Sequence, residues 1–293
     1  MRLSRLLAPG LTVADDGQQV EITGLTADSR AVRPGMLFAA LPGSRADGRA
    51  FIDDALARGA AAILGDPSLA GVQVPVPLIL DPNPRRRLAL MAARLFERQP
   101  RWIAAVTGTN GKTSVAGFTR QIWTGLGLAA GSLGTLGLDA QGVQRSSNLT
   151  TPDPVQLHAL LAEVAAAGID HLVLEASSHG LDQHRLDGVR LGAAAFTNLS
   201  RDHFDYHGSF ADYLAAKRRL FSELLPPEGT AVLNADQPEY ASLSALCRGR
   251  GIGVLDYGRR AERLRLGALT PDAEGQEIQF TLDGRPYRAR LGL

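Results

Sequence analysis

The stretch from Val106 to Ser114 (VTGTNGKTS) holds residue types that bind phosphate. The apolar run from Trp102 to Ala105 predicts a strand before it, and four apolar residues at helical spacing predict a helix after it: Val115, Phe118, Ile122 and Leu126. In such an arrangement, backbone N–H groups and the helix N-terminus surround phosphate oxygens. Lys112 would neutralise the β- and γ-phosphates, and the Thr113 hydroxyl would bind Mg²⁺.

The match to the strict phosphate-loop pattern is partial. That pattern requires a glycine five positions before Gly111, where this chain has Val106. The alternative interpretation is a glycine-rich turn that only caps a helix, and the strand before the loop argues against it.

Composition restricts the class of protein. The chain has 293 residues, enough for two domains of ordinary size, and 45% hydrophobic residues support buried cores. Its net charge of +1 suggests neither a nucleic-acid nor a membrane partner. Cys247 is the only cysteine, so no intrachain disulfide can form and a reducing compartment is expected.

The N-terminus carries no recognisable targeting segment. Its apolar run breaks at Pro9-Gly10, which is too early for a signal peptide. No uncharged apolar stretch approaches the ~20 residues of a membrane span. A cytoplasmic location is therefore expected.

The first part of the chain alternates strand-like and helix-like patterns, which is typical of an α/β fold. Helices are predicted at Phe51 to Arg58 and from Pro84 through Phe96. Apolar runs predict strands at Met36 to Leu41, Ala60 to Leu64 and Pro77 to Leu80. The polar stretch 97–101 contains a proline and predicts a boundary, which gives domains at 1–97 and 98–293.

The second domain is expected to be α/β as well, with a parallel sheet. A helix begins at Asp153-Pro154, and buried strands are predicted at His171 to Leu174, Ala193 to Thr197 and Thr230 to Leu233. Because ligands collect at the carboxyl ends of parallel strands, Lys112, Glu175 and the stretch 198–207 are expected to share one edge. The tail changes to short alternating strands with an Asp283-Gly284 turn, which predicts a small antiparallel element.

Acidic and histidine side chains at this edge could hold a metal ion. Glu175 directly follows an apolar strand and could reach Mg²⁺ beside a nucleotide, or it could pair with a neighbouring base. Asp202, His203, Asp205 and His207 resemble metal-ligand spacing, but a single cysteine and no HExxH pattern give zinc weak support. For His203, metal binding and a structural hydrogen bond both stay open.

Lys217 lies on the apolar side of a helix predicted over 212–225. At about 100° per residue it falls inside the face formed by Tyr213, Leu220, Phe221 and Leu224. A buried lysine is unfavourable unless it is paired or chemically altered. The alternative is that its stem lies on the core while its ammonium group reaches water.

Other polar residues are candidates for anion binding. Thr150 and Thr151 precede a helix and could cap it or bind a substrate anion. Arg185, close to Gln183, is a candidate clamp for a carboxylate, with an exposed loop arginine as the alternative. Residues 85–87, three arginines, could bind an anion, although a solvated helix face is the favoured interpretation.

Four stretches together resemble the Mur ligases of peptidoglycan synthesis. TGTNGKTS is similar to their ATP loop, which also lacks the early glycine. EASSHGLDQHRLDG and NLSRDHFDYHGSFADYLAAKRRLF resemble the branch that adds a diamino acid to a UDP-N-acetylmuramoyl dipeptide. LTADSRAVRPGMLFAALPGSRADGRAFI is similar to a uridine-binding domain that this branch shares with one other. The SSHGLDQHR stretch argues against that other branch and against folylpolyglutamate synthetases.

The resemblance implies an N-terminal α/β uridine-binding domain, a central P-loop ATPase domain and a role for each candidate. The uridine diphosphate end of the substrate would contact Ala27, Ser29, Ser44, Arg45 and Ala46. ATP would contact Gly108, Thr109, Asn110, Gly111, Lys112, Thr113 and Ser114. The muramoyl dipeptide would contact Thr150, Thr151, Ser177, Gln183 and Arg185. Two Mg²⁺ ions would be held by Thr113, Glu175, His203 and a carbamylated Lys217. The implied catalytic set is Lys112, Glu175, His203 and Lys217.

The implied reaction is an ATP-dependent amide ligation. The γ-carboxylate of D-glutamate attacks ATP to form an acyl phosphate, and the amine of meso-diaminopimelate or L-lysine then displaces phosphate. In the family a third domain follows the position of Leu293, so this chain is expected to match the first two domains, to bind the UDP substrate and to ligate poorly. A monomer is expected. The alternatives are a non-ligating nucleotide-binding module and a simple P-loop phosphohydrolase or kinase.

Overall fold

The computed structural model describes residues 1–7, 17–43, 47–202 and 206–292. The chain folds into two compact units. Unit 1 comprises Met1–Gln99, Pro152–Ala166 and Gln183–Val189, and unit 2 comprises Pro100–Thr151, Ala167–Asp182 and Arg190–Leu293. Each unit has its own sheet, and the expected α/β class is confirmed.

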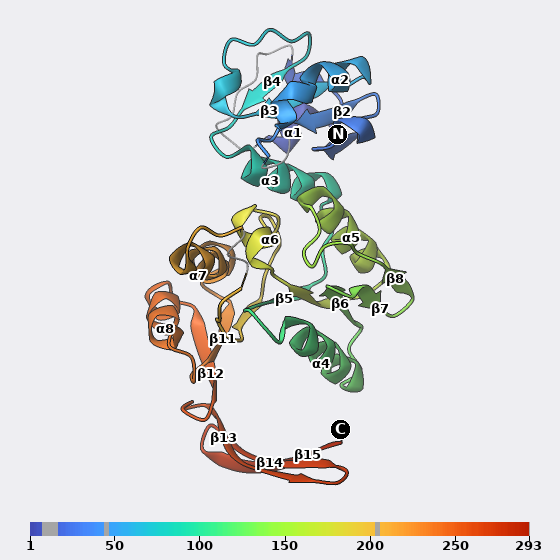
Figure 1. Ribbon diagram of the computed structural model, residues 1–293. Coiled ribbons are helices and arrows are strands. Elements are labelled where there is room, and N and C mark those ends of the chain that lie inside the picture. The colour runs from blue at the N-terminus through green and yellow to red at the C-terminus, as the bar shows by residue number, and fades with distance from the viewer. Residues whose placement is uncertain (8–16, 44–46, 203–205, 293) are drawn as a thin grey trace. The chain divides into compact units, whose positions relative to one another are not determined.

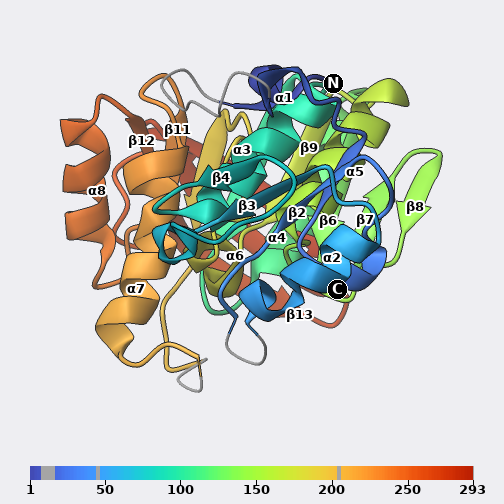
Figure 2. The same ribbon diagram turned by 90° about the horizontal axis from the view of Figure 1, so that it is seen from above.

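Unit 1 contains a parallel four-stranded sheet in the order β1-β2-β3-β4. The strands span Gly24–Thr26, Met36–Ala39, Ala62–Gly65 and Leu78–Leu80, and β2, β3 and β4 lie side by side in Figure 2. The helices of this unit are α1 (Leu3–Leu6), α2 (Ile52–Ala57), α3 (Pro84–Phe96) and α5 (Pro154–Ala166). The predicted strands β2, β3 and β4 are confirmed, whereas β1, with three residues, is too short to leave a pattern.

Both faces of this sheet are buried, which explains its continuous apolar runs. Successive side chains of a strand point to opposite faces. Leu37 of β2 therefore packs in one core with Leu88 and Met91 of α3, and Phe38 packs in the other with Ile52 of α2. The start of α3 follows the sequence signals, because Pro84 occupies its first turn and the Asn83 Oδ1 accepts a hydrogen bond from the Arg86 N–H at 3.0 Å.

Unit 2 contains an eleven-stranded sheet in the order β15-β14-β13-β12-β11-β10-β5-β9-β6-β7-β8. Its centre is parallel, and antiparallel strands lie at both ends. The central strands are β5 (Trp102–Thr107), β6 (Ala130–Gly134), β9 (His171–Glu175), β10 (Ala193–Phe196), β11 (Thr230–Asn234) and β12 (Gly253–Gly258). The outer strands are β7 (Gly137–Ala140), β8 (Val143–Arg145), β13 (Leu264–Asp272), β14 (Gly275–Leu282) and β15 (Arg285–Gly292).

The antiparallel element predicted for the tail is confirmed, although its strands are longer than expected. The turn at Asp283-Gly284 joins β14 to β15, and both residues have positive φ angles, of 49° and 79°. The second antiparallel region, β6 to β8, was not predicted because its strands have only five, four and three residues.

The helices of unit 2 are α4 (Lys112–Gly125), α6 (Ser178–Asp182), α7 (Phe210–Arg219) and α8 (Tyr240–Gly249), with a single π-helical turn at Leu220–Leu224 after α7. Figure 1 shows α4 on one side of β5 and β6, and α8 packs on β11 and β12. None of the helices in the described part of the chain is long and apolar enough to cross a membrane.

The helix predicted after the phosphate loop is confirmed as α4, but three of the four apolar residues that indicated it face solvent. Phe118 and Ile122 are each 62% exposed and Leu126 is 71% exposed. The side of α4 that meets the sheet carries Ala116, which packs in one cluster with Val106 of β5 and Val173 of β9, and Trp123 packs against this cluster. Periodicity identifies a helix but does not say which of its sides contacts the sheet.

We expect Cys247 to be unreactive in the native protein. Its side chain is fully buried in α8, and this burial raises the pKa of the thiol to about 11, so little thiolate forms near neutral pH. A chromogenic disulfide reagent at pH 8 should label one thiol only after denaturant is added. Rapid stoichiometric labelling of the native chain would contradict this burial.

Candidate active site

The phosphate loop joins β5 to α4 in unit 2 and adopts backbone conformations that favour glycine. Gly108 has a φ of 147°, and Gly111, with a φ of 83°, is the N-cap of α4. A Cβ atom on Gly108 would overlap the hydroxyl of Thr197. The two glycines therefore allow the loop to turn tightly against the end of β10.

Two residues that follow β10 fasten the loop. The Thr197 hydroxyl donates to the Asn110 carbonyl at 2.7 Å, and Asn198 Oδ1 accepts from the Asn110 N–H at 3.0 Å. The Thr109 N–H donates to the Asn198 carbonyl at 2.9 Å. Sequence reasoning did not single out Thr197 as a support of the loop, although its place at the end of an apolar strand was a usable signal.

Glu175 and Thr113 lie together at the carboxyl edge of the sheet. The Glu175 carboxylate is 2% exposed and accepts a hydrogen bond from the Thr113 hydroxyl at 3.0 Å. It also accepts from the backbone N–H of Thr135 at 2.9 Å and from the Thr135 hydroxyl at 3.2 Å. Thr135 was missed from the sequence, because its role arises only when β6 pairs with β9.

Lys112 points back onto its own loop. Its Nζ donates to the carbonyls of Gly108 at 2.9 Å and Thr109 at 2.8 Å. Burial lowers the pKa of Lys112, and the negative charges of Glu175 and Asp202 oppose this shift. The Lys112 ammonium group is therefore held against the carbonyl groups of the phosphate loop.

Lys217 is buried against the same loop, so the alternative in which its ammonium reaches water is wrong. The residue is 1% exposed, and its Nζ donates to the Gly108 carbonyl at 2.8 Å and lies 4.3 Å from the centre of the Tyr213 ring. Burial, together with the nearby charge of Lys112, lowers the pKa of Lys217 to about 7, and Asp202 opposes the shift. A substantial fraction of Lys217 is therefore an uncharged, nucleophilic amine at neutral pH.

Three of the dipeptide-site candidates, Thr150, Thr151 and Ser177, join this network in unit 2. The Thr151 hydroxyl donates to the Glu175 carbonyl at 2.8 Å and accepts from the Ser177 N–H and hydroxyl, both at 3.0 Å. The Thr150 and Thr135 hydroxyls are 3.0 Å apart. The alternative role of helix capping is wrong, because Asp153 caps α5 instead.

The uridine-site candidates lie in unit 1. Ala27 and Ser29 line a pocket of about 720 Å³, together with Asp28, Arg30, Phe38, Leu41, Gly48, Phe51 and Asp54. The Ser29 hydroxyl binds the Asp54 carboxylate and, with Arg58, lowers the pKa of Asp54. Ser44, Arg45 and Ala46 lie outside the described residues.

Gln183 and Arg185 also belong to unit 1 and contact each other. The Arg185 guanidinium donates to Gln183 Oε1 through Nε at 3.1 Å and through a terminal nitrogen at 2.6 Å. Each arginine at 85–87 has a defined partner: the Pro42 carbonyl, Asp187 and Asp81 respectively. The Arg86 side chain is 54% exposed, as predicted for a solvated helix face, whereas that of Arg87 is only 13% exposed.

Of the predicted metal ligands, Thr113, Glu175 and Lys217 belong to the described residues. His203 lies outside the described residues. Within the described ranges, no group of three His, Cys, Asp or Glu side chains is arranged to hold a metal ion. A magnesium ion at Thr113 and Glu175 would therefore complete its shell with other oxygen ligands, such as phosphate and water.

Comparison with known proteins identifies the family. The model of the Mur ligase middle domain matches residues 106–293, and that of the Mur ligase family, catalytic domain, matches residues 21–95. The chain belongs to the Mur ligase family. The two matches place the phosphate loop, Glu175 and Lys217 in the middle domain of a Mur ligase and Ala27 and Ser29 in the N-terminal match.

Several Mur ligases are close relatives in sequence. The chain is 50% identical to the UDP-N-acetylmuramoyl-L-alanyl-D-glutamate–2,6-diaminopimelate ligase of Bradyrhizobium diazoefficiens, over 100% of this chain and 61% of that protein. It is 52% identical to the protein of the same name from Rhizobium meliloti, over 86% of this chain and 51% of that protein. The chain thus spans about three fifths or less of the length of these relatives.

Solved structures of Mur ligases share this fold. A UDP-N-acetylmuramoyl-L-alanyl-D-glutamate–2,6-diaminopimelate ligase is 28% identical, with a TM-score of 0.85, over 99% of this chain and 59% of that one. The MurF ligase of Thermotoga maritima, solved in complex with ADP, is 19% identical, with a TM-score of 0.57, over 92% of this chain and 58% of that one. At that identity the second likeness concerns the fold alone.

Proposed function

We propose that the protein is an ATP-dependent ligase that joins a diamino acid to the D-glutamate of UDP-N-acetylmuramoyl-L-alanyl-D-glutamate. The observation that carries the proposal is the meeting of Lys112, Thr113, Glu175 and Lys217 around one phosphate loop. The names of the relatives that are about 50% identical support the choice of acceptor and favour 2,6-diaminopimelate over L-lysine.

The chain's own residues account for the phosphoryl-transfer step. The N–H groups of Gly111, Lys112 and Thr113, at the N-terminus of α4, bind the phosphates of ATP, and Lys112 turns from its own loop carbonyls to the γ-phosphate. The D-glutamate γ-carboxylate attacks the γ-phosphorus, ADP leaves, and an acyl phosphate results. The amine then attacks the acyl carbon, a tetrahedral intermediate forms, and inorganic phosphate leaves. Positioning and charge neutralisation are the main contributions of a protein to phosphoryl transfer.

Thr113 and Glu175 fit a magnesium ion, because both present oxygen ligands and their side chains already touch. Bound Mg²⁺ would neutralise charge that develops on the phosphates. His203 is a further proposed ligand. The buried, partly uncharged amine of Lys217 fits carbamylation, in which its nitrogen attacks CO₂, loses a proton and becomes an anion able to bind a second Mg²⁺.

The remaining assignments rest on the same proposal. Ala27 and Ser29, with Ser44, Arg45 and Ala46, bind the uridine diphosphate end of the substrate. Thr150, Thr151, Ser177, Gln183 and Arg185 bind the muramoyl dipeptide. A domain boundary near residue 97, a monomeric state and a cytoplasmic location stay predictions.

Calorimetry on this chain tests the two binding functions separately. UDP-N-acetylmuramoyl-L-alanyl-D-glutamate and a non-hydrolysable ATP analogue with Mg²⁺ should each bind in a 1:1 ratio. Any phosphate that the protein releases from ATP should require both the UDP dipeptide and diaminopimelate. ATP hydrolysis that is indifferent to the UDP dipeptide would indicate a phosphohydrolase, and binding without phosphate release would indicate a non-ligating module.

A further inference from the structure

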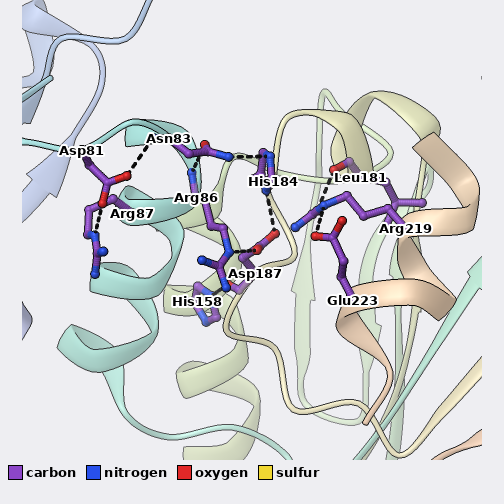
Figure 3. Close-up of polar contacts among 10 residues, drawn as sticks. All are labelled: Asp81, Asn83, Arg86, Arg87, His158, Leu181, His184, Asp187, Arg219 and Glu223. Atoms are coloured by element: carbon purple, nitrogen blue, oxygen red, sulfur yellow. Dashed lines mark hydrogen bonds and ion pairs between the residues drawn. The ribbon is translucent and has the colours of Figure 1, made fainter. Parts of the chain in front are cut away.

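The turn after Gln183 is fastened from several directions within unit 1 (Figure 3). His184 contacts Asn83, the residue that caps α3, and Asp187 contacts Arg86 of α3. The Asp187 carbonyl is 3.0 Å from Nε2 of His158, a fully buried histidine of α5. The Gln99 amide donates to the Gly188 carbonyl at 2.9 Å. Together these contacts hold the turn in a single conformation.

The helix cap determines how His184 is bound. Asn83 Oδ1 is occupied as the acceptor for the Arg86 N–H at 3.0 Å, so the amide nitrogen of Asn83 must face the His184 ring. That nitrogen is a donor, and it lies 2.9 Å from His184 Nε2, which must therefore be the acceptor. The ring proton is then on Nδ1, which faces the Asp187 carboxylate at 3.4 Å.

Asp187 is the second fixed point of the turn. Its side chain is 3% exposed, and one carboxylate oxygen accepts from Arg86 Nε at 3.1 Å while the other faces His184. The Asp187 N–H donates to the His184 carbonyl at 3.3 Å. Asn83, His184, Asp187 and Arg86 thus form a closed ring of polar contacts between the first turn of α3 and the segment 184–187 (Figure 3).

His184 also has an unusual backbone conformation. Its φ of 58° lies in the left-handed region, which non-glycine residues adopt uncommonly and in which histidine and asparagine are enriched. A left-handed residue reverses the direction of the chain, and the side chains on either side of it, Gln183 and Arg185, meet at 2.6 Å. The same residue therefore anchors the turn and sets the relative positions of its two neighbours.

We propose that His184 is a positioning residue for the muramoyl-dipeptide end of the substrate. This inference rests on the proposed function, in which Gln183 and Arg185 bind the muramoyl-dipeptide end. By fixing the turn before ligand arrives, His184 holds the Arg185 guanidinium and the Gln183 amide in one geometry for a carboxylate or amide of the dipeptide. Ordering that is already present in the free protein does not reduce affinity on binding.

The test compares two ligands that share the nucleotide pocket of unit 1. UDP-N-acetylmuramoyl-L-alanyl-D-glutamate carries the dipeptide, whereas UDP-N-acetylglucosamine lacks it. In the His184→Ala chain, calorimetry should give an approximately tenfold higher Kd for the first ligand and an unchanged Kd for the second. Unchanged binding of the second ligand shows that unit 1 is still folded.

Conservative variants separate positioning from general stability. Asparagine tolerates the left-handed conformation and can donate to Asp187, so His184→Asn should recover part of the lost affinity. Asn83→Ser keeps a capping residue for α3 but removes the contact with the His184 ring. The double variant Asn83→Ser with His184→Ala should therefore have the same Kd for the dipeptide ligand as His184→Ala alone. His171→Ala, a histidine of unit 2 paired with Asp170, is the matched control and should bind both ligands normally.

Two results would overturn the inference while leaving the proposed function intact. Either His184→Ala binds the dipeptide ligand as tightly as the unmodified chain, or it weakens both ligands equally. An unmodified chain that binds UDP-N-acetylglucosamine but gains nothing from the dipeptide would overturn the assignment of Gln183 and Arg185, and this inference with it.

Discussion

Replacing Lys217 with methionine is expected to lower kcat for ligation by about 10²–10³-fold, the range found when one charge-stabilising group is removed from an active site. Lys217 is 1% exposed and contacts the Gly108 carbonyl of the phosphate loop, and methionine has a similar length but no charge. The variant should nevertheless be more stable, by roughly 1–4 kcal/mol, as found when buried ionic groups are replaced by apolar ones. Loss of activity with a gain in stability separates a functional lysine from a structural one.

The pH dependence of stability provides an independent measurement. The pKa of Lys217 is about 7 in the folded chain and 10.5 in the reference state. Between these values the unfolded chain binds more protons, so the free energy of unfolding should rise as the pH increases from about 7 to 10.5. Below about pH 7 both states are protonated, and the cost of burying the cation is present in full.

Chemical denaturation across this pH range should therefore give a steeper rise for the unmodified chain than for Lys217→Met. In ¹³C-bicarbonate, the unmodified chain should also show a carbamate carbon signal that the variant lacks. Equal pH profiles for the two proteins would show that Lys217 does not titrate in this window. A fully active methionine variant would remove Lys217 from the proposed catalytic set.

Replacing Gly108 with alanine is expected to weaken binding of an ATP analogue by roughly 5- to 150-fold, the equivalent of the 1–3 kcal/mol that a strained backbone conformation costs. The φ of 147° at Gly108 is unfavourable for a residue with a Cβ atom, and that atom would overlap the Thr197 hydroxyl. Thr197 would have to move, and its hydrogen bond to the Asn110 carbonyl would break. The loop would then lose the closed arrangement of N–H groups that surrounds phosphate.

Gly117 provides the matched control for this substitution. It lies in α4, nine residues after Gly108, and a Cβ atom there would meet nothing within 4 Å. Gly117→Ala should therefore bind the analogue normally and be more stable by roughly 0.5–1 kcal/mol, the usual gain in a helix. Both variants should bind UDP-N-acetylglucosamine normally, because that pocket is in unit 1. Normal ATP-analogue binding by Gly108→Ala would contradict the role given to this loop.

Features encoded by local signals could be predicted from the sequence. The start of α3 follows from Asn83 and Pro84, and the strand–loop–helix of the phosphate loop follows from its glycines and flanking apolar runs. The position of Lys217 inside an apolar arc was visible in the sequence, which left open whether its ammonium group reaches water. Its contact with Gly108 could not be predicted, because the two residues are 109 positions apart.

Features that depend on strand order could not be predicted. Thr135 binds Glu175 only because β6 lies next to β9, and Thr151 meets Ser177 across 26 positions of sequence. The side of α4 that faces solvent could not be predicted for a related reason, since apolar residues such as Phe118 keep helical spacing whether or not they face the sheet. The ring of contacts around His184 likewise needs α3, α5 and the turn to be assembled first.

Unit 1 is built from three separate segments of the chain, which affects how it folds during synthesis. Its sheet and α3 come from the first hundred residues, but α5, which packs on α3, and the turn that binds Asn83 and Arg86 come from beyond residue 150. On a translating ribosome, α3 must therefore wait on the order of ten seconds for its last partners, at the usual rates of synthesis. During that interval its α5-facing side is open to solvent and to chaperones, and the phosphate loop is synthesised before the N-terminal unit is complete.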